Sequence, residues 1–234
     1  MISQSIGYLR ESDEWVKTVV LGGLFVLLSA LVVPAILVSG YLVRVLRATM
    51  HDDDTPPTFD EWGDLFGDGL RAFAIAVVYG IVPAILAVAL AVSAAAAAGV
   101  GGRTGAAVGG MVILVGGFVT LVLGLLAAYV VPAAVANYAE RDTLGAGFAF
   151  GDLRPVLTSA RYAGAWARGF LVVVVAGIVG GLFNVVPILG AVVAAVVSFY
   201  AVVAAYYLVG HAFGDLHDLT VHEGEETPDE RPAV

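Results

Sequence analysis

Long stretches without charged residues dominate this chain, and polar segments separate them. The clearest stretch lies between Arg168 and Asp215, which enclose 46 uncharged residues. About 20 apolar residues of helix cross a hydrocarbon core of roughly 30 Å, so this stretch is long enough for two spans. It is interrupted near Asn184 and Pro187. We therefore predict a helical hairpin that turns at residues 184–187.

The same pattern recurs upstream and predicts an all-α, polytopic membrane protein of five to six transmembrane helices arranged as hairpins. Arg71 and Arg103 enclose 31 uncharged residues, and 36 more lie between Arg103 and Glu140. We expect these two stretches to form a hairpin that turns at the glycine-rich segment 99–102. The predicted apolar segments are 16–47, 71–98, 106–139, 168–185 and 188–213, within one integral membrane domain of residues 1–220. Residues 221–234 are expected to form an acidic, disordered tail.

The first apolar segment, residues 16–47, allows two interpretations. It would form one helix about 40 Å long with a kink at Pro34, or a hairpin that turns at residues 32–34. In this segment a Trp, a Gly-Gly pair and a Val-Val-Pro run follow one another, and the last hairpin has the same three features in the same order at different spacings. This loose repeat favours the second interpretation. The 14 residues from Pro34 to Arg47 would, however, reach only about 21 Å. Both interpretations stay open at this stage.

Two polar segments, residues 48–69 and 140–166, separate the apolar ones. In the first, aromatic and leucine residues recur at helical spacing on one side and acidic residues lie elsewhere. The apolar side consists of Phe59, Trp62, Leu65, Phe66 and Leu70, and the acidic residues are Asp60, Glu61, Asp64 and Asp68. The second segment mixes arginines with aromatic residues and is expected to break at Pro155. We predict that both are amphipathic helices lying in the cytoplasmic membrane interface.

The distribution of basic residues predicts the orientation. If the N-terminus, both polar segments and the tail share one side, that side holds ten of the eleven Lys and Arg residues, and Arg103 lies alone opposite. If the first apolar segment is a single span, the N-terminus lies on the opposite side, and the basic residues divide eight against three. Basic residues accumulate on the cytoplasmic side of membranes. Both versions therefore predict a multi-pass protein of the cell membrane with a cytoplasmic C-terminus.

Composition agrees with the membrane class. Hydrophobic residues make up 60% of the 234 positions and the mean hydropathy is +0.94, values that a water-soluble domain of this size would not sustain. Twenty acidic residues outnumber eleven basic ones, of which Lys17 is the single lysine. This bias resembles that of salt-adapted archaeal proteins, and it makes nucleic acid an unfavourable partner. Cysteine is absent, which excludes disulfides and thiolate chemistry.

Three polar sets are candidate sites, and each also has a simpler explanation. The first is a C-terminal set that consists of His211, Asp215, His217, Asp218, His222 and Glu223. Two of its members are four residues apart and would share a helix face as metal ligands. The set matches no metal-binding motif, so we expect no metal. The acidic residues of the first polar segment, with Asp52, Asp53 and Asp54, would bind a cation or simply hydrate the surface. A third set would bind anionic lipid head groups, although the cytoplasmic excess of basic residues also explains it; it consists of Arg141, Arg154, Arg161 and Arg168.

Few residues in the spans are able to specify a ligand. Between the charges that bound them, the apolar runs contain no Asp, Glu, Lys or Arg, and their amide side chains are Asn137 and Asn184. This disfavours a coupled transporter. Phosphate-loop, nucleophile-elbow and dinucleotide-binding motifs are also absent. We expect a non-enzymatic protein without a cofactor that associates with membrane lipids or with a protein partner at its cytoplasmic face; its oligomeric state is left open. The alternative is a channel or transporter subunit for a small solute.

Function is expected at the cytoplasmic interface. There Phe59, Trp62 and Phe66 would anchor the acidic segment in the membrane, and the segment from Arg141 to Arg168 would supply the opposite charge. If both segments insert at one depth, they would be able to pack together as an acid–base platform, in which only close pairs count at high salt.

One run of residues carries a family resemblance. The sequence GYLVRVLR at 40–47, followed by PTFDEWGDLF at 57–66 and DGL at 68–70, is similar to an archaeal family called domain of unknown function 4013. The similarity covers most of the chain. More weakly, the segment from Pro132 to Tyr162 resembles bacterial six-span families, including the membrane domain of some glycerophosphodiester phosphodiesterases. That resemblance implies proximity to lipid chemistry, but it transfers no catalytic residue, because the phosphodiesterase chemistry lies in a separate soluble domain.

Overall fold

The computed structural model describes residues 2–53, 55–100, 102–183 and 187–225. Within these residues it contains helices and no strand, which confirms the predicted all-α class. Five helices are long and apolar enough to cross a membrane: α3 (Val33–Met50), α4 (Trp62–Val100), α5 (Gly102–Arg141), α7 (Ala160–Leu182) and α8 (Pro187–Glu225). The shorter elements are α1 (Ile2–Gly7), η1 (Tyr8–Glu11), α2 (Trp15–Leu27), η2 (Ser29–Leu31), η3 (Leu144–Phe148) and α6 (Phe150–Thr158).

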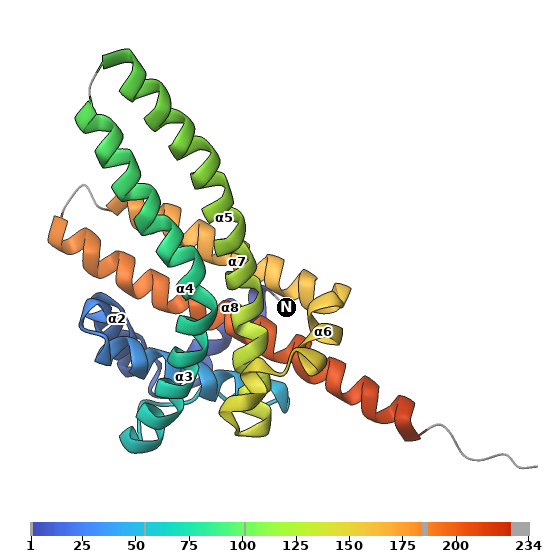
Figure 1. Cartoon of the computed structure of the whole chain (residues 1–234). Helices are drawn as coiled ribbons and strands as arrows, with labels where there is room; N and C mark the ends of the chain where they lie inside the picture. The colour runs from blue at the N-terminus through green and yellow to red at the C-terminus, as the bar shows by residue number, and fades with distance from the viewer. Residues whose placement is uncertain (1, 54, 101, 184–186, 226–234) are drawn as a thin grey trace, which may run out of the picture.

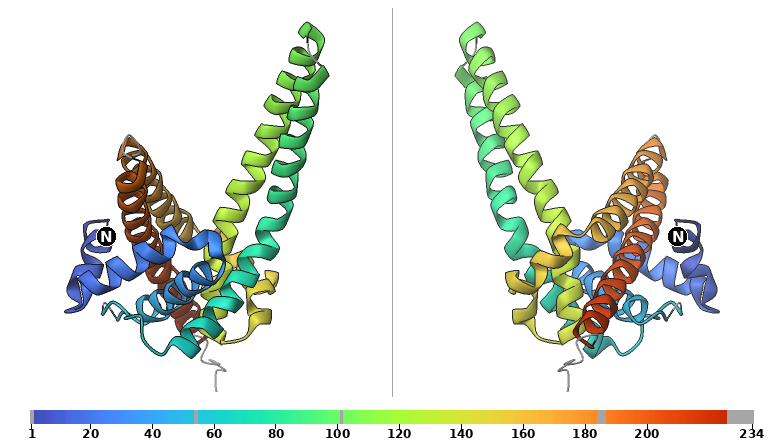
Figure 2. Two further views of the ribbon diagram at one scale, coloured as in Figure 1. Left: turned by 90° about the vertical axis from the view of Figure 1, so that its left-hand side faces the viewer. Right: turned by 90° about the vertical axis from the view of Figure 1, so that its right-hand side faces the viewer.

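Two helical hairpins diverge from a common base (Figures 1 and 2). Helices α4 and α5 pair along their length, as do α7 and α8. The predicted turn of the first hairpin is confirmed, since α4 ends at Val100 and α5 begins at Gly102, whose φ of +67° favours glycine. The second hairpin turns between Leu182 and Pro187 as predicted, although residues 184–186 lie outside the described ones. The hairpins approach each other mainly through α5 and α8, near the base.

Helix α3 lies at this base and packs between α4 and α8. Gly40 of α3 and Gly69 of α4 face each other so closely that a Cβ on either would collide with a carbonyl of the opposite helix, that of Leu65 or Ile36. Gly210 of α8 similarly leaves no room for a Cβ beside α3. Small residues of this kind let helix backbones approach in membranes, where packing replaces the hydrophobic effect as the driving force.

The first apolar segment forms two separate helices. Helix α2 ends at Leu27, and a short helical turn leads to Val32, whose φ of 48° breaks the helix. Helix α3 then begins at Val33, with Pro34 in its first turn. With 13 residues, α2 is about 20 Å long and too short to cross the hydrocarbon core. It packs instead against α8, where Gly22 lies against the ring of Phe199. The break predicted by the hairpin interpretation is present, but only α3 has the length of a span.

Three predicted boundaries differ in the structure. The acidic segment is not a separate interfacial helix, because α4 runs unbroken from Trp62 to Val100; Gly67 and Gly69 weaken a helix without ending it. The second polar segment does not break at Pro155, which lies inside α6; the break comes at Ser159, whose hydroxyl caps α7 by accepting from the Arg161 amide. Helix α8 includes residues 221–225 of the predicted tail, and residues 226–234 lie outside the described chain.

Pro132 explains how α5 is joined to α7. Proline lacks an amide hydrogen and disturbs the helix one turn earlier, so the carbonyls of Ala128 and Tyr129 need other donors inside a membrane. The indole Nε1 of Trp166 donates to the Ala128 oxygen at 2.9 Å, and the hydroxyl of Tyr162 donates to the Tyr129 oxygen at 2.6 Å. Two side chains of α7 thus satisfy the backbone that Pro132 exposes.

We predict that Gly40→Ala and Gly69→Ala each destabilise the protein by about 1–3 kcal/mol, because the added methyl group overpacks the α3–α4 contact. Gly67→Ala is the matched control on α4: a Cβ there meets nothing within 4 Å, and the change should be neutral or stabilise by up to about 1 kcal/mol. The free energy of unfolding, followed by circular dichroism during titration with a denaturing detergent, tests the comparison. Equal effects at the three positions would contradict the close contact.

Candidate functional site

Polar side chains gather at the base from which the hairpins diverge. The start of α4, the end of α5, α6 and the start of α7 all lie there (Figure 2). Both polar segments of the sequence therefore meet at one end of the molecule, as the charge bias requires. That this end faces the cytoplasm stays a prediction.

A buried carboxylate links three helices at this end. Asp68 of α4 is 8% exposed and forms a two-pronged ion pair with Arg47 of α3, whose Nη2 lies 3.3 Å from Oδ1 while Nη1 contacts Oδ2. The hydroxyl of Tyr138, from α5, donates to the same carboxylate at 2.8 Å. Arg47 also donates to the Ala139 carbonyl at 3.2 Å and to Asp142 at 2.8 Å. Each charge is thus hydrogen-bonded as well as paired, which a buried ion pair requires.

A second arginine of α3 fixes the loop that leads into α4. Arg44 donates to Asp60 at 2.8 Å and to the Thr58 carbonyl at 3.2 Å, and it lies 3.4 Å from Glu61. A hydrogen bond from the Thr58 hydroxyl, followed by that from Arg44, lowers the pKa of Asp60. The carboxylate therefore stays ionised at a more acidic pH than an ordinary aspartate, and the ion pair between Asp60 and Arg44 persists at that pH.

Between these arginines lies an open cavity of about 650 Å³. Its lining charges are Arg44, Arg47, Arg71, Glu61, Asp64, Asp68 and Asp142. Five of the seven take part in the pairs described above, and Arg71 adds a longer contact of 3.6 Å to Asp68. The cavity is thus bordered by charges that mostly neutralise one another.

Phe59, Trp62 and Phe66 do not form one membrane-facing stripe. Phe59 precedes α4, is 5% exposed, and stacks on Tyr41 with ring centroids 4.5 Å apart. It belongs to a buried aromatic cluster with Phe199 of α8. Trp62 and Phe66 are 47% and 37% exposed. Of the three, Trp62 and Phe66 therefore remain available to anchor the base in the membrane interface.

The predicted acid–base platform is wrong in its pairing. In the first polar segment, Asp60 and Glu61 pair with Arg44 of α3, and Asp68 pairs with Arg47. Arg141 pairs instead with Asp152 in its own segment at 2.8 Å, and Arg161 pairs with Asp215 of α8 at 3.1 Å. Arg154 lies exposed on α6. The α3 arginines were not predicted as partners, because Arg47 and Asp68 are 21 residues apart along the chain and belong to different helices.

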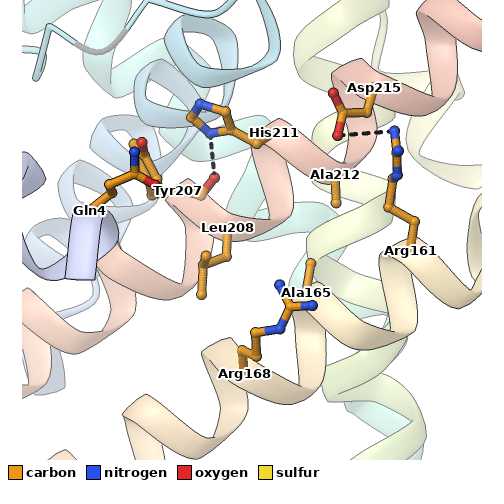
Figure 3. Close-up of a pocket in the computed structure, with 9 residues that line it drawn as sticks. All are labelled: Gln4, Arg161, Ala165, Arg168, Tyr207, Leu208, His211, Ala212 and Asp215. Carbon is orange, nitrogen blue, oxygen red and sulfur yellow. Dashed lines mark hydrogen bonds and ion pairs between the residues drawn. The ribbon is translucent and has the colours of Figure 1, made fainter. Parts of the chain in front are cut away.

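Arg161 and Arg168 line a cavity of about 340 Å³ between α1, α7 and α8 (Figure 3). The other lining residues are Gln4, Ala165, Tyr207, Leu208, His211, Ala212 and Asp215. His211 and Asp215, the first two members of the candidate metal set, thus share a cavity wall. Nδ1 of His211 lies 3.0 Å from the Tyr207 carbonyl, however, and Asp215 is paired with Arg161.

No three His, Asp or Glu side chains converge as metal ligands among those the structure describes. The side chains of His217, Asp218, His222 and Glu223 lie outside that set, as does residue Asp54. Asp52 and Asp53 are exposed in the loop after α3, where the Thr55 amide donates to Asp53 at 2.9 Å.

An apolar groove of about 220 Å³ lies between the two hairpins. Helix α5 contributes Ala128 and Pro132, α7 contributes Trp166, Gly169, Phe170 and Val173, and α8 contributes Val202, Ala205, Tyr206 and Val209. The Trp166 and Phe170 rings stack with centroids 5.0 Å apart. This groove was not predicted from the sequence, because three separate helices supply its apolar lining. The one sign of it in the sequence is Pro132, a proline inside a long apolar stretch.

These features define a polytopic helical membrane protein with a charged base and two diverging hairpins. A family model described as "Protein of unknown function (DUF4013)" matches residues 23–185, and the chain belongs to this family. The match covers α3 to α7, including the run of residues 40–70 that carried the resemblance. Comparisons with curated proteins and with solved structures gave no match.

We predict that Asp68→Asn destabilises the protein by about 3 kcal/mol, since it leaves the Arg47 charge without its buried partner while preserving side-chain volume. The control is Glu14→Gln, which removes the exposed pair of Glu14 with Lys17 and should cost less than about 1 kcal/mol. Detergent-induced unfolding of both variants measures the difference. If the two substitutions cost the same, the Arg47–Asp68 pair does not hold the base together.

Proposed function

We propose that this protein is a non-enzymatic membrane module that retains a lipid between its two hairpins. The observation that carries the proposal is the apolar groove between α5, α7 and α8. It lies at the depth of the spans, because Gly169, Phe170 and Val173 directly follow the last charged residue of α7, Arg168. An acyl chain is the species that the bilayer supplies at this depth.

The chemistry of the groove supports an apolar occupant. The indole Nε1 of Trp166 is occupied by the Ala128 carbonyl. Apart from Tyr206, the remaining lining side chains contain only carbon and hydrogen beyond the backbone. A ligand with a polar group in this part of the groove would lose water without gaining a partner, which costs free energy. A hydrocarbon chain carries no such penalty and fills space that would otherwise lack van der Waals contact.

The divergence of the hairpins gives an acyl chain a path from the bilayer into the groove. Away from the base, the α4–α5 pair separates from the α7–α8 pair (Figure 2). Large apolar residues are exposed along both pairs, for example Leu121 on α5 and Ile178 on α7. Exposed apolar surface at this depth faces lipid, so a chain is able to reach the groove sideways from the bilayer.

We predict that Val173→Phe reduces the lipid that remains bound after detergent extraction, because the larger side chain fills the groove. Val175→Phe is the control on the same helix: Val175 is 50% exposed and does not line the groove. Lipids that co-purify with each variant are quantified by mass spectrometry. Equal retention in wild type and both variants would contradict the proposal. Proteoliposomes would show a solute flux if the protein is a channel or transporter subunit. A flux that is the same for wild type and Val173→Phe would favour that alternative.

A further inference from the structure

Tyr206 of α8 borders two separate spaces. On one side it lines the apolar groove, together with Val202, Ala205 and Val209 of the same helix. On the other side it lines a small cavity of about 30 Å³, where it is the one residue that the described part of α8 contributes. The side chain therefore extends from α8 along the wall of the groove to the small cavity, and the hydroxyl is the tip of that side chain.

The hydroxyl of Tyr206 has no hydrogen-bonding partner within the part of the chain that the structure describes. Other tyrosines of the same cluster do have one, since Tyr162 donates to the Tyr129 carbonyl at 2.6 Å and Tyr129 donates to the Leu157 carbonyl at 2.7 Å. A hydroxyl removed from water without a partner costs free energy, and buried polar groups are therefore usually paired. The tyrosine ring also holds the hydroxyl away from its own helix, so it cannot bond to a nearby carbonyl as serine and threonine do.

The small cavity offers one further side-chain hydroxyl, that of Ser39 on α3. Ser39 donates its hydrogen to the Ala35 carbonyl at 2.9 Å, so its oxygen keeps lone pairs that are able to accept. The remaining lining side chains are hydrocarbon and come from α3, α4 and α5: Leu42, Ala72, Ala76, Val131 and Val135. Two hydroxyls from different helices thus share a small space with apolar walls.

The volume of the cavity suits a water molecule. A cavity holds a water when it offers about 10–15 Å³ or more of such volume and about two to four polar partners. The cavity exceeds this volume. Water is also close by, because Ala72 directly follows Arg71, which lines the open charged cavity at the base.

We propose that this small cavity binds a water molecule between Tyr206 and Ser39. The Tyr206 hydroxyl donates to the water oxygen, and the water donates one hydrogen to Ser39 Oγ. The hydroxyl of Tyr206 then has the partner that the protein itself does not supply. The water links α8 to α3 and keeps the Tyr206 ring in place as a wall of the groove. The site goes beyond the proposed function, since it does not require a lipid in the groove.

The test is radiolytic labelling of the full-length protein in lipid nanodiscs, in which an X-ray pulse converts bound water into hydroxyl radicals that oxidise adjacent side chains. Leu42 is the reporter, because it is 8% exposed and lines the small cavity but not the groove. Leu46, one turn further along α3 and 0% exposed, does not line the cavity and is the reference. Mass spectrometry should find several-fold more oxidation at Leu42 than at Leu46.

Two variants remove one partner of the water each. Ser39→Ala and Tyr206→Phe should both lower the oxidation of Leu42 several-fold, while Leu46 stays protected and shows that α3 remains packed. Ser29→Ala is the matched control, because Ser29 likewise donates to the carbonyl four residues earlier, that of Phe25 at 2.8 Å, but does not line the cavity. It should leave the oxidation of Leu42 unchanged.

Equal oxidation of Leu42 and Leu46 in the wild type would overturn the proposal. So would oxidation of Leu42 that neither Ser39→Ala nor Tyr206→Phe reduces. Val173→Phe, which fills the groove, should leave the oxidation of Leu42 unchanged, because Val173 does not line the small cavity. Failure of the water site and failure of the lipid groove therefore give different results.

Discussion

The ion pair between Arg47 and Asp68 is the constraint on which the base of the structure depends. Both charges lie where a membrane helix meets its neighbours, and an unpaired charge at such a position would cost several kcal/mol. Tyr138 and the Ala139 carbonyl complete the hydrogen bonding, so α3, α4 and α5 are fixed to one another at a single point. The close contact of Gly40 with Gly69 joins two of the same helices, α3 and α4. From this base the two hairpins leave in different directions.

The divergence of the hairpins connects this constraint to function. Pro132 exposes two carbonyls of α5, and Trp166 and Tyr162 satisfy them from α7, so the hairpins stay joined near the base. Beyond that point no buried polar contact draws them together among the described residues, and their apolar faces require no partner other than lipid. The groove between the hairpins follows from the same arrangement. We therefore propose lipid association as the function.

The sequence predicted those features that depend on the length and polarity of continuous stretches. Hairpin turns at Gly99–Gly102 and before Pro187 followed from long uncharged runs, because a bilayer sets the length of a span. The sequence misplaced features that depend on contacts between helices. Phe59 has the helical spacing of Trp62 and Phe66, yet it is buried, because Tyr41 and Phe199 from distant segments cover it. In the sequence, Asp68 is not distinguishable from the exposed acidic residues around it. The structure shows that it pairs with Arg47 of α3.

The central claim, that the hairpins diverge from a fixed base, is tested most directly by two distances in lipid nanodiscs. The chain has no cysteine, so pairs introduced at exposed positions can be spin-labelled for pulsed electron paramagnetic resonance. One pair joins Leu126 and Phe170 near the base, and the other joins Leu114 and Leu182 farther towards the tips. The account predicts a clearly longer distance for the second pair. Similar distances for both pairs would mean that the hairpins lie parallel and in contact, and would contradict it.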